Sequence, residues 1–487
     1  MPHPIFEIDE LVRLVIDELV KTSPKTAVSF ALTCRSLEEP TLSSLWKQRE
    51  SLDCLLRVLP SRTWVEDNYG AFVSGCDFPV YRIRYRSPQT FERDPSAEDW
   101  ARLKRYASWM RSLHLSCHEF HSSDTLSQLS SNSPGGLLLP KLERLHWSFE
   151  RLMHAIPFFR LFLSPHLQHV TLSTYMRRIP EHLLVPLAQM ISLLPTSLEY
   201  LSFVWVRGND ELLDDAVSSF VCRCGPSMRS FETCAPLSEA ATNHLMQLPN
   251  LSHWFTVQGP PRVIPTSIFP SLESVHLYKP EALPWLHLLS THERGTLQDG
   301  SIPATSYTNI REMLRSLECP RTILNSTLLS SIVKFRNLVK LVIHNDVCPK
   351  TGDCTFRLTD DNMENLATTL PRLKNLRLGH PCLSNSCDVT VASLLSISVN
   401  CPDLTVLETH FSTQTIVSDM QDLLDGGAGC DRIKCKVRSL VVGWLPLRVS
   451  GKDTETVAMG FKTIFPCLTN FDCWGRDWLE LNSKLGD

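Results

Sequence analysis

Histidine and cysteine are the residues of this chain best suited to chemistry, and their spacing decides which chemistry. The run Cys117-His118-Glu119-Phe120-His121 is close to the helical motif of zinc proteases. In that motif the two histidines are four residues apart and face one side of a helix, but His118 and His121 are only three apart. We therefore interpret the run as a polar loop.

The 17 cysteines are scattered, and most lie beside apolar residues. Close pairs could bind zinc, but none has the two-residue spacing of a zinc knuckle. The pairs are Cys222/Cys224, Cys348/Cys354, Cys382/Cys387 and Cys430/Cys435. We interpret the cysteines as small buried hydrophobes in a reducing compartment, and we expect no metal and no cofactor.

Motifs of the common enzyme classes are absent from the sequence. Gly451-Lys452 does not fit a phosphate-binding loop, because Pro446 stands at the first glycine and Asp453 replaces the hydroxyl residue. Neither Gly-x-Ser-x-Gly nor Gly-x-Gly-x-x-Gly occurs. We expect no catalytic residues, so the chain is predicted not to be an enzyme.

The charge balance excludes classes of partner. The chain has 487 residues, 43% of them hydrophobic, and its 48 basic and 52 acidic residues leave a net charge of −4. This composition predicts a large folded core without general attraction to nucleic acid or anionic membrane. Met1-Pro2-His3-Pro4 does not begin a signal peptide, and no apolar run reaches the length of a membrane span. We expect a cytoplasmic or nuclear protein.

Three short helical patterns occupy the first 46 residues. Leu11, Leu14, Val15, Leu19 and Val20 recur in steps of three and four, opposite Asp9, Glu10, Arg13 and Asp17. Thr22-Ser23-Pro24 ends that pattern, and a second helix carries Val28, Ala31 and Leu32. A third follows Pro40, with Leu42, Leu45 and Trp46.

This series resembles an F-box of the form common in large fungal families. The resemblance rests on Ile8-Asp9-Glu10-Leu11, Ile16-x-x-Leu19, Ala31 to Leu37, and Pro40-x-Leu42-x-x-Leu45-Trp46. The Leu-Pro that often opens an F-box is replaced by Ile8-Asp9. The resemblance implies that the trio docks the Skp adaptor of a cullin-RING ubiquitin ligase, while the rest of the chain selects the substrate. Adaptor-facing or supporting residues would be Leu11, Leu14, Leu19, Leu32, Leu42 and Trp46. The other interpretation is a helical cap on a larger domain.

A six-residue unit, apolar-x-x-apolar-x-apolar, recurs along the chain. The better copies start at Leu142, Leu167, Leu198, Leu272, Leu338 and Leu373, three of them introduced by Pro140, Pro270 and Pro371. Weaker copies start at Met110, Met228, Leu251, Leu314, Leu404, Val437 and Leu468. Their mean spacing of about 30 residues indicates a solenoid.

The fold class predicted is α/β: a three-helix F-box followed by a leucine-rich-repeat-like solenoid of parallel strands plus helices. The last two apolar residues of each unit alternate as in a strand, and helical patterns such as Met363-Leu366-Leu370 separate the units. Asn400 to Leu407 resembles the cysteine-containing repeats of F-box proteins. The spacing is irregular and the usual asparagine ladder is missing, which indicates a degenerate array. A doubly wound α/β sheet is the alternative.

These patterns suggest four regions. We predict an F-box over 1–50, a connecting region over 51–105, a leucine-rich-repeat-like array over 106–476 and a C-terminal tail over 477–487. Breaks in the period predict surface loops at Ser122–Gly136, Lys279–Thr308, Asn345–Arg357 and Ser412–Lys436.

Histidines concentrate on one face of the predicted strands. Residues between and just after the last two apolar positions of a unit would face the open side of the sheet. Seven of the 17 histidines occupy such positions, with His114 among them. We predict substrate binding by His146, His169, His253, Phe255, His276, Tyr278, His344, Arg377 and His410. The plainer interpretation is that histidine tolerates a half-buried strand surface.

The function predicted is the substrate adaptor of a Skp–cullin–F-box ubiquitin ligase. The partners would be the Skp adaptor, the cullin-RING ligase and an unknown protein substrate, with no nucleic acid and no membrane. The alternative is a repeat scaffold for protein interactions that is not linked to a ligase.

Overall fold

The computed structural model gives the fold of most of the chain. It describes residues 9–60, 63–65, 90–115, 123–133, 136–148, 153–174, 179–205, 210–262, 268–278, 280–291, 314–320, 326–344, 358–379, 388–409, 411–413, 415–426, 435–442, 452–473 and 481. The chain divides into two units, Met1–Ala241 and Thr242–Asp487.

Parallel strands in chain order form the sheet of the N-terminal unit. They are β1 (Gln48–Arg49), β4 (Ser112–Leu115), β5 (Arg144–Ser148), β6 (His169–Thr174), β7 (Tyr200–Trp205) and β8 (Ser230–Thr233). A separate antiparallel pair joins β2 (Trp64–Val65) to β3 (Thr90–Phe91). Strands β4 to β7 therefore each pair with the parallel strand before and the parallel strand after them.

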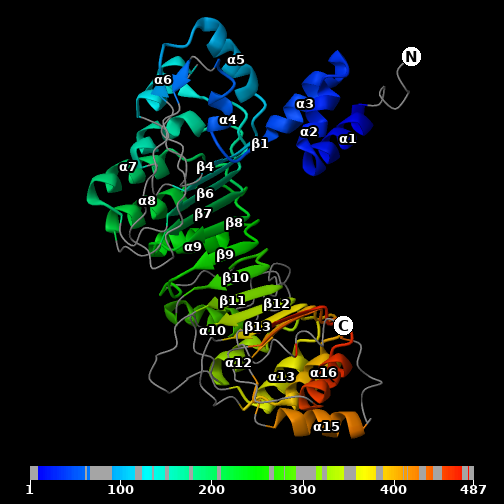
Figure 1. Ribbon diagram of the computed structural model, residues 1–487. Helices are drawn as coiled ribbons and strands as arrows, with labels where there is room; N and C mark the ends of the chain where they lie inside the picture. Colours follow the sequence, from blue (N-terminus) through cyan, green and yellow to red (C-terminus); the bar gives the residue numbers. More distant parts are fainter. Residues whose placement is uncertain are drawn as a thin grey trace. The chain divides into compact units, whose positions relative to one another are not determined.

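Helices connect these strands. α1 (Asp9–Thr22), α2 (Pro24–Ala31) and α3 (Arg35–Lys47) precede β1 and pack against one another. The others are α4 (Asp53–Leu56), α5 (Ala97–Ala107), α6 (Ser123–Asn132), the 3-10 helix η3 (Met153–Phe162), α7 (Glu181–Ser192) and α8 (Glu211–Val221). Figure 1 shows α7 and α8 together along one side of the strands.

The C-terminal unit repeats the arrangement. Its strands pair in parallel in chain order: β9 (His253–Thr256), β10 (Ser274–Leu277), β11 (Ser316–Pro320), β12 (Lys340–His344), β13 (Asn375–Gly379), β14 (Val406–Thr409), β15 (Ser439–Val442) and β16 (Asn470–Cys473). Its helices are η4 (Pro280–Ala282), α10 (Pro284–Thr291), α12 (Ser326–Ile332), α13 (Asp360–Thr369), α14 (Val391–Asn400), α15 (Ile416–Gly426) and α16 (Lys452–Ile464). The boundary between the units falls within α9 (Glu239–Gln247).

The predicted repeat is confirmed at every copy. The first apolar residue of each of the thirteen units lies two residues before a strand, from Met110 before β4 to Leu468 before β16. A doubly wound sheet reverses its strand order at a switch point, whereas both units keep the chain order throughout. The alternative of a doubly wound fold is therefore wrong, and the chain is a leucine-rich-repeat-like solenoid.

The apolar positions of the repeat form the core between strands and helices. In the N-terminal unit Leu145, Val170 and Leu201 lie in register on adjacent strands, and all are fully or almost fully buried. Leu341, Leu376 and Leu407 form the equivalent row in the C-terminal unit. Burial of one such side chain stabilises the fold by about 1.5–3 kcal/mol, and a single repeat could not achieve it without its neighbours.

A backbone ladder joins each repeat to the next where the strands begin. The N–H groups of Lys374 and Asn375 both donate to the Val339 carbonyl, at 2.8 and 3.1 Å. The N–H groups of Thr405 and Val406 in turn donate to the Lys374 carbonyl at 2.8 and 3.1 Å. The repeats therefore satisfy these backbone groups without an asparagine ladder.

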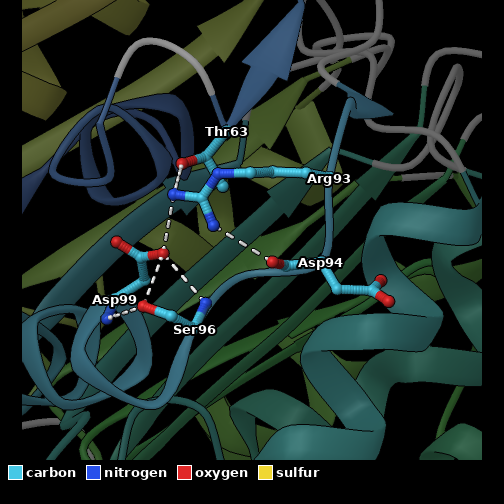
Figure 2. Close-up of polar contacts among 5 residues, drawn as sticks. All are labelled: Thr63, Arg93, Asp94, Ser96 and Asp99. Carbon is cyan, nitrogen blue, oxygen red and sulfur yellow. Dashed lines mark hydrogen bonds and ion pairs between the residues drawn. The ribbon is translucent and has the colours of Figure 1, made fainter.

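A polar cluster fixes the start of α5 (Figure 2). The Asp99 N–H donates to Ser96 Oγ at 3.2 Å, and Asp99 Oδ2 accepts from the Ser96 N–H at 2.9 Å, which completes a capping box. Arg93 Nη2 also donates to Asp99 Oδ2 at 2.9 Å and to Thr63 Oγ1 at 3.0 Å. The hydrogen bond from the Ser96 backbone, assisted by Arg93, lowers the pKa of the buried Asp99 carboxyl.

The sheet begins earlier than the array predicted over 106–476. β1 follows α3 directly and pairs with β4 through Gln48 and Ser112. A two-residue strand has too little alternation to give a sequence signal, which is why we placed 48 and 49 in the F-box region. The proposed domain bounds otherwise remain predictions.

Candidate functional site: the N-terminal helices and the open face of the sheet

The three N-terminal helices share a small core of their own. Val12, Ile16 and Leu37 are buried together, and Val20 and Phe30 pack against them. Ser44 Oγ on α3 donates to Asp17 Oδ1 on α1 at 2.5 Å, which adds a polar link between the two helices. α2 begins at Pro24, which suits the first turn of a helix because proline has no N–H to satisfy there.

Apolar side chains remain exposed on the outside of this trio. Leu14 is 64% exposed and Leu32 is 80% exposed, and Leu11, Val15 and Val28 are also exposed. They make up half of the large hydrophobic side chains that are exposed among the described residues. Since soluble proteins rarely gather such residues without a partner, this surface is a candidate docking site.

The buried side of α1 differs from the prediction. We expected Leu11, Leu14 and Val15 to line one apolar face, but the helix buries Val12 and Ile16 instead. Apolar residues occur on more than one side of α1, so periodicity alone could not choose the side that meets α2 and α3. Val12 and Ile16 were absent from the predicted apolar stripe, although they are also four residues apart.

The predicted adaptor-binding residues fall into two groups. Leu11, Leu14 and Leu32 are exposed, whereas Leu19, Leu42 and Trp46 are half-buried. Their role in adaptor binding remains a prediction.

Trp46 joins the trio to the repeats. Its ring centroid lies 4.8 Å from that of Tyr106 on α5, and the Arg49 guanidinium carbon lies 4.6 Å from the Trp46 ring centroid. Tyr106 in turn contacts Trp109 edge-on, with ring centroids 5.2 Å apart. The Arg111 N–H also donates to the Lys47 carbonyl at 3.0 Å. The trio is thereby attached to the first strands of the sheet by both side-chain and backbone contacts.

A groove of about 710 Å³ lies beside this junction. Charged residues line much of it: Arg13, Asp17, Arg35, Glu39 and Lys47, with Trp109 just after α5. The mixture of both signs favours a polar contact over a small apolar ligand.

The open face of the N-terminal unit carries the predicted histidines. His114 and His146 are in register on β4 and β5, with ring centroids 4.1 Å apart. Burial, and to a smaller extent the neighbouring His114, lowers the pKa of His146. His169 stacks on Tyr200 at 6.0 Å, and burial lowers the pKa of His169 and raises that of Tyr200.

An aromatic cluster marks the open face of the C-terminal unit. Phe255 lies 4.6 Å from His276 and 5.5 Å from Tyr278 between ring centroids. His276 Nδ1 is 3.9 Å from Glu318 Oε2, and Glu318 also forms an ion pair with Lys340 on the next strand. The structure thus brings together Phe255, His276 and Tyr278, which we had predicted to share one face. Glu318, which we had not predicted, joins them from the next strand.

The remaining predicted substrate residues lie on or near the same face. His253 is exposed on β9 beside Ser274, and Arg377 lies 3.9 Å from Glu408 on the next strand. His344 is in register with Pro320 and Gly379, but its side chain is outside the described part of the chain. His410 lies outside the described residues altogether.

Cysteine behaves only partly as predicted. Cys224, Cys319, Cys401 and Cys435 are buried, and burial raises the pKa of Cys224 and of Cys401 to about 12. Cys34, Cys222 and Cys467 are exposed. Cys348, Cys354, Cys382, Cys387 and Cys430 lie outside the described residues, as do Cys117, His118 and His121. Among the described residues, no group of three or more His, Cys, Asp or Glu side chains is placed to hold a metal ion.

The comparisons with known proteins find distant likenesses among solved structures only. Neither a protein-family model nor a curated protein matches the chain. One of them is the leucine-rich repeat-containing protein LegL7 from Legionella pneumophila, with 9% sequence identity and a TM-score of 0.28. The matched region covers 68% of this chain and 93% of the LegL7 chain. The repeat fold of the present chain rests on its strand order and register.

The described part of the chain contains no helix that could span a membrane. None of the helices there combines the length and the apolar character that a membrane span needs.

Sequence reasoning missed two features of the surface. β1 and the contacts of Trp46 connect residues that are about 60 positions apart, so no local pattern reveals them. The second is a row of basic residues where strands of the C-terminal unit begin. Arg315, Lys374 and Arg438 each lie one residue before a strand, and their recurrence in the repeat was a signal that could have been found.

Proposed function

We propose that this chain is the substrate adaptor of a Skp–cullin–F-box ubiquitin ligase, and that it has no active site of its own. In this proposal α1 and α2 dock the Skp adaptor, and the open face of the repeats holds a protein substrate. The chain would contribute proximity, because it raises the effective concentration of substrate lysines near the ubiquitin-charged enzyme. Such a complex would work in the cytoplasm or the nucleus.

The exposure of Leu14 and Leu32 is the observation that carries the proposal. A helical cap would bury its apolar residues against the first repeat, whereas a docking module must leave some of them free. The trio has its own core in Val12, Ile16 and Leu37, so its outer residues are not needed to hold the three helices together. The resemblance of the segment to an F-box supplies the identity of the partner.

Binding of a purified Skp adaptor to point variants tests this proposal. Leu14→Asp combined with Leu32→Asp should reduce binding at least tenfold, because both side chains would be desolvated in the complex. Val185→Asp with Leu212→Asp is the matched control, since these residues are also exposed but lie on α7 and α8. Point variants are preferable to deletion of 1–46, which would remove Trp46 from its contact with Tyr106.

The outcomes separate the two candidate functions. Loss of binding in the variant with Leu14→Asp and Leu32→Asp, but not in the control, would support the function of a ligase adaptor, provided that thermal unfolding is unchanged. Absence of binding by the unaltered chain would favour a repeat scaffold whose N-terminal helices act as a cap. The attachment of Trp46 to α5 and the pairing of β1 with β4 are the observations that favour this second candidate.

A further inference from the structure

One edge of the sheet in the C-terminal unit carries a surplus of basic side chains. Arg315, Lys374 and Arg438 lie one residue before β11, β13 and β15, where the parallel strands begin. Arg336 and Arg372 lie in the turns before β12 and β13. All five are exposed, and we call them the basic edge.

The carboxylates on these strands and turns already have basic partners. Glu318 pairs with Lys340, Asp403 Oδ1 lies 2.7 Å from Lys436 Nζ, and Glu408 Oε2 lies 3.9 Å from Arg377 Nη1. Within the described residues, no ion pair closer than 4.0 Å involves a member of the basic edge, although Asp403 also attracts Lys374 at longer range and Arg315 Nη1 donates to the Asn337 carbonyl at 3.4 Å. The positive charge of this edge is therefore in excess.

The spacing of the strands sets the length of ligand that fits. Adjacent strands lie about 4.8 Å apart, so the edge from β11 to β15 extends over about 19 Å. An extended peptide advances about 3.3 Å per residue, which corresponds to about six residues across the same distance. The basic side chains would meet such a peptide at intervals along its length.

The surroundings favour carboxylates over nucleic acid. Phe335, the aromatic residue next to Arg336, is buried and offers no surface on which a base could stack. The pairs Lys436–Asp403 and Lys340–Glu318 also interrupt the positive surface, which suits discrete carboxylates better than a continuous phosphate backbone.

We propose that the basic edge binds an extended acidic segment, about six residues long, of a partner protein. The binding is mainly electrostatic and is sensitive to salt, because the basic groups are exposed to solvent. The interaction does not depend on whether the N-terminal helices bind a Skp adaptor.

Fluorescence anisotropy with the full-length chain tests the proposal. The probes are labelled peptides of eight glutamates and of eight lysines, and a single-stranded DNA of eight nucleotides. The test variant is Arg372→Glu with Lys374→Glu. The control is Arg160→Glu with Lys462→Glu, which makes the same change in net charge at exposed positions on η3 and α16.

The proposal predicts that the glutamate peptide binds the unaltered chain in 50 mM salt and binds at least tenfold more weakly in 500 mM salt. The test variant should lose at least tenfold in affinity, whereas the control should change less than twofold. The proposal is overturned by no binding of the glutamate peptide, by equal losses in both variants, or by tighter binding of the DNA. Binding of the lysine peptide equal to that of the glutamate peptide would also overturn it.

Discussion

Gly460 shows how one residue can set the distance between two helices. A Cβ atom at this position of α16 would overlap Met420 Sδ and lie 2.9 Å from Met420 Cγ on α15. Met420 is fully buried, so its side chain has little freedom to move away.

We expect Gly460→Ala to lower the free energy of unfolding by about 1–3 kcal/mol, because overpacking outweighs the better helix propensity of alanine. Gly426→Ala is the matched control, since nothing lies within 4 Å of its added Cβ. Denaturant unfolding measures both. A Gly460→Ala variant as stable as the unaltered chain would contradict the close packing of α15 and α16.

His146, on the open face of the N-terminal unit, makes the stability of the folded chain depend on pH. Burial and His114 lower the pKa of His146 in the folded chain, while the unfolded chain keeps the ordinary value near 6.5. Above pH 6.5 both states are neutral there, and the histidine imposes no penalty. As the pH falls below 6.5 the unfolded state takes up the proton first, so stability decreases until the pH passes below the folded pKa.

We expect His146→Gln to reduce the loss of thermal stability between pH 7.5 and pH 5.5. Thermal unfolding at the two pH values measures the effect, with His253→Gln as a control because His253 is exposed. An unchanged difference between the two pH values in His146→Gln would show that other groups cause the dependence.

At the scale of the element, α5 depends on its cap. Ser96 and Asp99 satisfy each other's backbone N–H groups, and Asp99 also accepts from Arg93. We expect Ser96→Ala to lower the free energy of unfolding by about 1 kcal/mol, the usual cost of losing an N-cap. Ser108→Ala at the other end of α5 is the control, because the exposed Ser108 Oγ only donates to the Arg105 carbonyl. Equal stability of the two variants in denaturant would contradict the role of the cap.

The junction between α3 and the sheet depends on contacts between side chains of different elements. Trp46→Ala removes the contact with Tyr106 and the support of the Arg49 guanidinium, so we expect α1 to α3 to separate more readily from β1 and β4. Limited proteolysis should then cleave near Lys47 and Arg49 faster than in the unaltered chain. Leu14→Asp is the control, because Leu14 is exposed on the trio and absent from this junction. Equal cleavage rates in the three proteins would show that β1 pairing alone holds the junction.

At the scale of the whole molecule, the described strands from β4 to β8 and from β9 to β16 pair with their neighbours in chain order. Such an array has few contacts between distant repeats, so its stability is close to a sum of local terms. Leu376→Ala removes a fully buried side chain from β13, and we expect a loss of about 2–5 kcal/mol that is concentrated in the adjacent repeats.

Hydrogen exchange of backbone amides measures where that loss occurs. Amides of β12 to β14 should exchange much faster in Leu376→Ala, while those of β5 to β7 should keep their protection. Faster exchange of equal size in all strands would indicate that the chain unfolds as one cooperative unit.

The repeat and its strands could be predicted from the sequence because both are local. An apolar residue two positions before each strand and alternation within the strand are enough to place β4 to β16, and the alternation also assigns His146, His276 and Arg377 to the open face. Every strand then has one possible partner on each side, because short connections keep neighbouring repeats together.

Contacts between distant residues were decided only by the tertiary structure. Periodicity showed that α1 is amphipathic, but only its packing on α2 and α3 determined that Val12 and Ile16 are buried while Leu14 is exposed. In the same way, only the tertiary structure places Trp46 against Tyr106, which lies 60 residues later in the chain. The free energy of burial belongs to pairs of surfaces, so a single segment cannot specify which of its sides is buried.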